Sequence, residues 1–301
     1  MSNGQAQSRN VIARIDPSRK EVEAEIPIAG PAWALAAGEG AVWAGIPLFS
    51  EPRAAATGGI VQRIDPVTNS VVATIHVGPY PGPIAAGAGS IWVVAGDASE
   101  DSQQLFRIDP ESSRVTARVP IPGLSDGYIY DMAMVAGDVW LLQHGSRPGS
   151  HVEHNGYVVR IDGETGEIVQ VIPAEGIAMA AGHDRIVVIG RIDDRGDWRG
   201  VSVARTIDTT EGTSSGPPVP LGQGLSPFAA GPGDVWATGP TSRYGWVQIL
   251  RLHPETFAVA DRVATLGTAI YTDLAWDPAM RAIWVATAVD GSAVLVHVDL
   301  A

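Results

Sequence analysis

The chain contains no cysteine, which excludes disulfides, thiolate metal sites and cysteine nucleophiles. Basic residues are also scarce, with 20 Lys plus Arg against 33 Asp plus Glu and a formal net charge of −13 at pH 7. Such an acidic balance repels phosphate backbones and anionic lipid headgroups. We therefore expect neither a nucleic acid nor a membrane surface as a partner.

Long apolar runs are missing as well. No stretch approaches the ~20 apolar residues needed to span a bilayer, and the polar segment Met1–Asn10 has no apolar core of the kind found in secretory signals. These absences predict a cytoplasmic protein. Phosphate-binding glycine loops, serine nucleophile elbows and kinase motifs are absent too, and the chain shows no sustained helical period.

A tight turn followed by an apolar run recurs along the sequence, and most copies carry a tryptophan at the same place. The copies are Gly40-Ala41-Val42-Trp43, Ser90-Ile91-Trp92, Gly137-Asp138-Val139-Trp140, Asp184-Arg185-Ile186-Val187, Gly233-Asp234-Val235-Trp236 and Arg281-Ala282-Ile283-Trp284. Successive copies lie 49, 48, 47, 49 and 48 residues apart, counted at the tryptophan position. Spacing this regular indicates repeats that stack into one body.

A second phrase occurs once in each unit, at the end of an alternating apolar run. Its copies are Arg14-Ile15-Asp16-Pro17, Arg63-Ile64-Asp65-Pro66, Arg107-Ile108-Asp109-Pro110, Arg160-Ile161-Asp162-Gly163, Thr206-Ile207-Asp208-Thr209 and Arg251-Leu252-His253-Pro254. The run has the period of a strand, and Asp followed by Pro favours a turn because the carboxylate accepts backbone N–H groups. Each unit thus reads as four strands, which in the second unit are Ile84–Gly87, Ser90–Ala95, Gln104–Asp109 and Arg114–Pro120.

Four antiparallel strands every ~40–50 residues are typical of propeller blades rather than of a helical solenoid. We expect an all-β, six-bladed β-propeller that occupies residues 1–301 as a single domain. The runs Val11–Asp16 and Ala293–Asp299 are both copies of the third strand, and either fits the last blade. We expect that blade to combine strands from both ends of the chain, because this arrangement removes exposed edges.

The unit resembles the YVTN/NHL-type β-propeller repeat, and its Gly-x-Val-Trp motif is similar to that of the virginiamycin B lyase-like group. That group implies a metal-dependent ring-opening elimination with a Glu-x-His element, which this sequence lacks; its nearest phrase is His151-Val152-Glu153-His154. The gluconolactonase-like family implies Ca²⁺ held by Glu, Asn and Asp, but only Asn155 of four Asn lies in a long loop. The resemblance therefore implies the scaffold, and the function must come from a site.

We expect the site on the face that carries the long insertions, since variable loops on a rigid scaffold commonly hold function. These insertions are Pro47–Gly59, Asp97–Gln103, Gly145–Gly156, Asp193–Gly200 and Thr241–Gly245. On the inner strands near this face, one register position holds Ala34, Pro83, Asp131, Ala178, Pro227 and Asp273. The two carboxylates belong to blades three and six, which stand opposite each other. They can act as general acid and base or hold a cation, or they can simply cap the ends of the strands.

His144 ends the strand beside Asp131 and is a candidate for an assisting base, although a histidine at a strand end often only faces solvent. Aromatic and methionine side chains around the channel are candidates for binding a substrate, or alternatively for plugging the channel. They are Trp33, Tyr80, Tyr130, Met132, Met179, Phe228, Tyr271, Trp198 and Trp246. A Zn²⁺ or Ni²⁺ site at His144, His151, Glu153 and His154 is a weaker alternative.

The sequence thus favours an enzyme of the lyase, cyclase or isomerase kind that acts on a small, largely apolar metabolite. Asp131 and Asp273 would move protons with help from His144, and no cofactor or metal would be required. Two alternatives stay open: a propeller that binds a small molecule or a protein without catalysis, and a metal-dependent lyase or hydrolase. The expected partner is a small-molecule ligand, and the sequence leaves the oligomeric state open.

Overall fold

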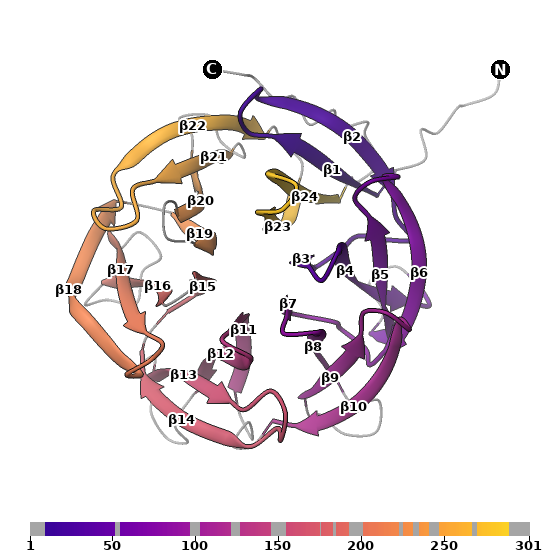
Figure 1. Cartoon of the computed structure of the whole chain (residues 1–301), viewed down its shortest axis with the longest axis horizontal. Helices are drawn as coiled ribbons and strands as arrows, with labels where there is room; N and C mark the ends of the chain where they lie inside the picture. Colours follow the sequence, from indigo (N-terminus) through magenta and orange to yellow (C-terminus); the bar gives the residue numbers. More distant parts are fainter. Residues whose placement is uncertain are drawn as a thin grey trace.

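The chain forms a ring of six four-stranded antiparallel sheets, a six-bladed β-propeller (Figure 1). The computed structural model describes residues 10–51, 55–96, 103–121, 127–145, 155–174, 176–182, 185–192, 201–222, 225–230, 235–240, 247–266 and 270–288. In Figure 1 each blade runs from an inner strand beside the central opening to an outer strand at the periphery. Within the described residues, no helix is long and apolar enough to cross a membrane.

The strands are numbered in chain order, and each blade is given from its inner to its outer strand. Blade one contains β3 (Ala34–Gly38), β4 (Ala41–Phe49), β5 (Ala56–Asp65) and β6 (Ser70–Val77). Blade two contains β7 (Ile84–Gly87), β8 (Ser90–Gly96), β9 (Gln103–Asp109) and β10 (Arg114–Pro120). Blade three contains β11 (Gly127–Val135), β12 (Asp138–Gly145), β13 (Asn155–Ile161) and β14 (Ile168–Pro173).

The other three blades have the same order. Blade four contains β15 (Ala178–Ala181), β16 (Arg185–Ile192), β17 (Val201–Asp208) and β18 (Thr213–Gly222). Blade five contains β19 (Ser226–Ala230), β20 (Val235–Pro240), β21 (Val247–Leu252) and β22 (Val259–Leu266). Blade six contains β23 (Ile270–Asp277), β24 (Ala282–Ala288), β1 (Val11–Asp16) and β2 (Glu21–Pro27).

Blade six joins the two ends of the chain, as the sequence predicted. β1 occupies the third position and pairs with β24, so that Arg14 lies opposite Trp284. β2 then pairs with β1 and forms the outer edge of the blade. The competing copy of the third strand, Ala293–Asp299, lies outside the described residues. The inner half of this blade thus comes from the end of the chain and the outer half from its beginning.

The repeated tryptophan and arginine lie opposite each other on neighbouring strands in five of the six blades. Trp43, Trp92, Trp140 and Trp284 are buried, and the arginine paired with each one lies with its guanidinium carbon 5.3–5.7 Å from the ring centroid. This contact combines apolar burial with cation–π attraction. In blade four, Val187 and Thr206 occupy the two positions opposite each other. Both members of the pair are therefore replaced in the same blade.

The aspartate of the second phrase ends the third strand and holds the turn that follows it. Asp65 Oδ1, for example, accepts the N–H groups of Val67 and Thr68 at 2.7 and 3.3 Å, and these bonds lower the pKa of its carboxyl. In blade five His253 replaces the aspartate, and its Nδ1 accepts the corresponding N–H groups of Glu255 and Thr256. The phrase is therefore structural, and it lies away from the inner strands that surround the axis.

Candidate functional site

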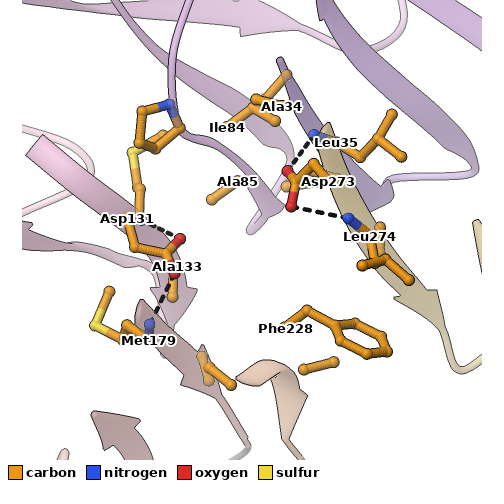
Figure 2. A pocket seen from close by; sticks show the side chains of 18 of the residues that line it. Ala34, Leu35, Ile84, Ala85, Asp131, Ala133, Met179, Phe228, Asp273 and Leu274 are labelled. Carbon is orange, nitrogen blue, oxygen red and sulfur yellow. Dashed lines mark hydrogen bonds between the residues drawn. The ribbon is translucent and has the colours of Figure 1, made fainter. Parts of the chain in front are cut away.

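A cavity of about 380 Å³ lies on the axis of the ring, and the inner strands of all six blades line it. Much of the lining is backbone and alanine, because β3, β7 and β15 carry small residues where the blades converge. Figure 2 shows two carboxyl groups in this cavity, Asp131 from β11 and Asp273 from β23. The two side chains thus line the same central cavity, which is where the register alignment of the sequence places them.

A backbone irregularity precedes each of the two aspartates. The pairing of β11 with β12 shifts between Ile129 and Asp131, and the pairing of β23 with β24 shifts between Tyr271 and Asp273. Each shift leaves one extra residue, Tyr130 or Thr272, on the inner strand. Such bulges bend a strand and redirect the neighbouring side chains. The inner strand of blade five has the same shift around Phe228, so the aspartates, rather than the bulges, distinguish the opposed blades three and six.

Both carboxyl groups also bridge to the next blade. Asp131 Oδ2 accepts the N–H of Met179 at 2.7 Å, and Asp273 Oδ2 accepts the N–H of Leu35 at 2.6 Å. The second oxygen of each aspartate accepts the N–H of the following residue at 2.8 Å. The capping role considered from the sequence is therefore present, but a carboxylate has about four acceptor positions and these bonds use two.

The cavity raises the pKa of both carboxyls. Removal from bulk water raises the pKa of Asp131 to about 7, against the opposing effect of its two backbone hydrogen bonds. Removal from water likewise raises the pKa of Asp273 to about 7, and the charge of Asp131 adds to the rise. Near neutral pH, each group can therefore either give or take a proton.

Three aromatic rings form a cluster, called the rim cluster below, beside the mouth of the central cavity. Trp33, Phe49 and Tyr80 have ring centroids 5.9–6.3 Å apart, and each residue keeps about 40% of its surface exposed. Trp33 also lines the cavity. The sequence identified Trp33 and Tyr80, but it missed Phe49 because the predicted loop Pro47–Gly59 hid the extension of β4.

The segment that carries Tyr80 is held by close backbone contacts. Tyr80 has a left-handed backbone with φ of 52°, between two prolines, and its hydroxyl oxygen accepts the N–H of Ala56 at 2.7 Å. Gly96 N–H donates to the Pro79 carbonyl at 2.7 Å. Eight other described non-glycine residues have a similar positive φ, so this conformation shows how the segment before β7 turns and is not by itself a sign of a functional site.

We expect Gly78→Ala to destabilise the protein by about 1–3 kcal/mol. A Cβ at Gly78 would lie 1.8 Å from the carbonyl oxygen of Gly96, so the backbone that positions Tyr80 must move. Urea denaturation measures the effect, and Gly58→Ala is the matched control because no atom lies within 4 Å of its added Cβ. Equal stability of the two variants would contradict the proposed close packing.

The other predicted binding residues are distributed unevenly. Tyr130 lines the cavity and is 46% exposed, whereas Met132 and Met179 line it but are largely buried between blades. Phe228 is half-buried and also lines the cavity. The backbone of His144 pairs with Tyr128, two positions from the partner of Asp131. The side chains of His144 and Tyr271, and all of Trp198 and Trp246, lie outside the described residues.

The metal alternative rested on His144, His151, Glu153 and His154, whose side chains also fall outside the described part of the chain. Within the residues that the structure describes, no group of three or more His, Cys, Asp or Glu side chains is placed to hold a metal ion. The two aspartates of the cavity are therefore the chemically distinctive feature of the described site.

Comparison with known proteins supports the fold and no more. Hydrazine synthase of Kuenenia stuttgartiensis has a TM-score of 0.55 at 14% identity, over 93% of this chain and 90% of that one. An acylaminoacyl peptidase of Pyrococcus horikoshii has a TM-score of 0.51 at 9% identity, over 82% and 41% of the two chains. The β-propeller domain of the Trilobed protease from Pyrococcus furiosus has a TM-score of 0.50 at 8% identity, over 88% and 80%. No protein-family model and no curated protein matches the chain.

Proposed function

We propose that the chain is an enzyme of the lyase, cyclase or isomerase kind that moves protons on a small, largely apolar molecule in the central cavity. One observation carries the proposal: two carboxyls with pKa values near 7 share this cavity and come from opposed blades. The ionised carboxyl takes a proton from the substrate, and the protonated carboxyl gives one to another substrate atom. Protons are thus conserved, and exchange with water restores the starting state.

The bulges and the cross-blade hydrogen bonds support this role because they fix the carboxyls before a substrate arrives. A catalytic group held in place by neighbouring backbone loses little freedom when it reacts. The aromatic cluster of Trp33, Phe49 and Tyr80 would hold an apolar substrate at the mouth of the cavity. No residue of this mechanism needs a bound cofactor. The likeness to the YVTN/NHL-type repeat and to the virginiamycin B lyase-like group remains part of the proposal, as a resemblance of scaffold.

The test compares wild type with Asp131→Asn and Asp273→Asn in a metabolite extract at pH 7, followed by mass spectrometry. We expect wild type to convert at least one compound, and each variant to convert it about 10²–10⁴-fold more slowly, as for loss of a general acid or base. Val72→Ala is the control, because Val72 lies on an outer strand and is exposed. Unchanged turnover in both aspartate variants would overturn the proposal.

The exposed rim cluster favours a second candidate, a propeller that binds its ligand without changing it. Exposed aromatic rings that border a cavity suit such a role as well as they suit catalysis. The same extract separates the two functions, since a binding protein returns the compound with its mass unaltered. Dialysis against a chelator before the assay tests the metal-dependent alternative, which predicts lost activity.

A further inference from the structure

The described lining of the cavity carries negative charge with nothing to balance it. Asp131 and Asp273 are its acidic side chains, and it contains no Lys or Arg. The four hydrogen bonds that the carboxyls accept come from neutral backbone N–H groups. The whole chain also has a formal charge of −13, so the field around it attracts cations and repels anions.

The mouth of the same cavity offers aromatic faces. Trp33 belongs both to the cavity lining and to the rim cluster with Phe49 and Tyr80, so the aromatic surface is continuous from the rim into the cavity. The faces of such rings are electron-rich and attract cations as well as apolar groups. The rings are in contact with one another at 5.9–6.3 Å, which leaves their outer surfaces, rather than a space between them, for a ligand.

We propose that the ligand of this cavity is an organic cation, a protonated amine attached to an apolar or aromatic body. The ammonium group would pair with one of the two carboxyls and keep it ionised, and the other carboxyl would stay available for proton transfer. The body would lie against Trp33 and the rim cluster. This proposal rests on the site assigned under the proposed function and names the class of molecule that the site accepts.

An organic cation fits the described site better than a bare metal ion. Ca²⁺ takes 6–8 oxygen ligands, which can include backbone carbonyls, and the described residues provide two carboxylates here with no third His, Cys, Asp or Glu side chain near them. An ammonium group needs only a few acceptors, and each carboxyl still has free acceptor positions. The aromatic surface would then contribute to binding, a role that a metal ion does not give it.

The test uses three probes of similar shape and different charge: 2-phenylethylamine, 2-phenylethanol and phenylacetate. Ligand-observed NMR titration at pH 8, above the pKa of about 7 of both carboxyls, gives the three dissociation constants. We expect the amine to bind at least about 10-fold more tightly than the alcohol, because an ion pair in a site removed from bulk water is stronger than at an exposed surface. Phenylacetate should bind more weakly than the alcohol.

Variants test the contributions of the two carboxyls and of the aromatic cluster separately. Asp131→Asn together with Asp273→Asn should remove the preference for the amine, and the two single variants give the same readout if the double variant fails to fold. Phe49→Ala should weaken 2-phenylethylamine several-fold and leave ethylamine unchanged, while Val72→Ala should change neither. Equal affinity for the amine and the alcohol in wild type would overturn the proposal.

The outcome is separable from that of the catalytic proposal. If the amine is preferred but no compound is converted, the ligand class stands and the enzyme function fails. If the compound consumed from the extract is neutral or anionic and its conversion depends on the aspartates, the enzyme function stands and the ligand class is wrong.

Discussion

Deletion of residues 1–27 is expected to leave a chain with no cooperative unfolding transition. The deletion removes β1 and β2, which supply Ile12, Ile15 and Ile26, each at most 1% exposed. It also uncovers Trp284 and the paired edge of β24. Loss of one buried isoleucine side chain costs about 2–5 kcal/mol, and total stabilities are about 5–15 kcal/mol, so three such losses exceed what the remaining ring can tolerate.

Circular dichroism during heating, together with size-exclusion chromatography, measures this effect. A synthetic peptide of residues 10–27 should restore the transition when it is added to the truncated chain, because it carries both missing strands. The same peptide with Ile12→Asp and Ile15→Asp should fail, since both side chains are buried in the complete ring. A truncated chain that melts like the full-length protein would show that closure by the N-terminal strands is dispensable.

The second large effect concerns pH. The pKa of the carboxyls of Asp131 and Asp273 rises from 3.8 to about 7 on folding, so between these values the folded state binds more protons than the unfolded chain. The free energy of unfolding contributed by these groups must therefore fall as pH rises from about 4 to about 7, and stay level above that. The loss is on the order of 2–4 kcal/mol for each carboxyl.

Urea denaturation at pH 4.5 and pH 7.5 measures this loss, and Asp131→Asn with Asp273→Asn is the comparison. Asparagine cannot ionise, so the stability of the variant should not fall between the two pH values as that of wild type does. Each amide leaves one of the two backbone N–H groups without an acceptor, which lowers the stability of the variant at both pH values. The turn aspartates act at lower pH, because the pKa values of Asp65, Asp109 and Asp162 are lowered and their contribution is lost only as pH falls below about 4. Parallel curves for wild type and variant would contradict the raised pKa values.

The stability that the two buried carboxyls cost near neutral pH bears on the function of the site. Each carboxyl accepts two backbone N–H groups through its two oxygens, whereas an asparagine or serine offers one acceptor oxygen. The pair therefore satisfies more of the backbone than a neutral residue would, but its charge lowers stability near neutral pH. Residues that reduce stability in this way are characteristic of functional sites.

The fold was predictable because its determinants are local and repeated. The spacing of the tryptophans and the Arg-Ile-Asp-Pro phrases gave the number of blades, and the strand bounds of blade two agree with the prediction to within one residue at each end. The choice of Val11–Asp16 for the last blade was left open, because the sequence contains two copies of that strand and only packing against β24 distinguishes them.

The site was predictable only in part. Register alignment identified Asp131 and Asp273, but their hydrogen bonds to Met179 and Leu35 join residues 48 and 238 positions apart, and no local pattern encodes such a contact. The sequence did not predict the bulges at Tyr130 and Thr272 for the same reason, because an extra residue on one strand can be recognised only by comparison with its partner strand.

The composition of blade six sets the order of events during synthesis. β1 and β2 are made before the other strands of the ring, but the strand that β1 pairs with, β24, ends at Ala288 and is made after all the other described strands. At about 5–20 residues per second, the interval is on the order of tens of seconds. During this interval the apolar side chains of β1 have no native partner, so a nascent chain must be protected from aggregation until its ring can close.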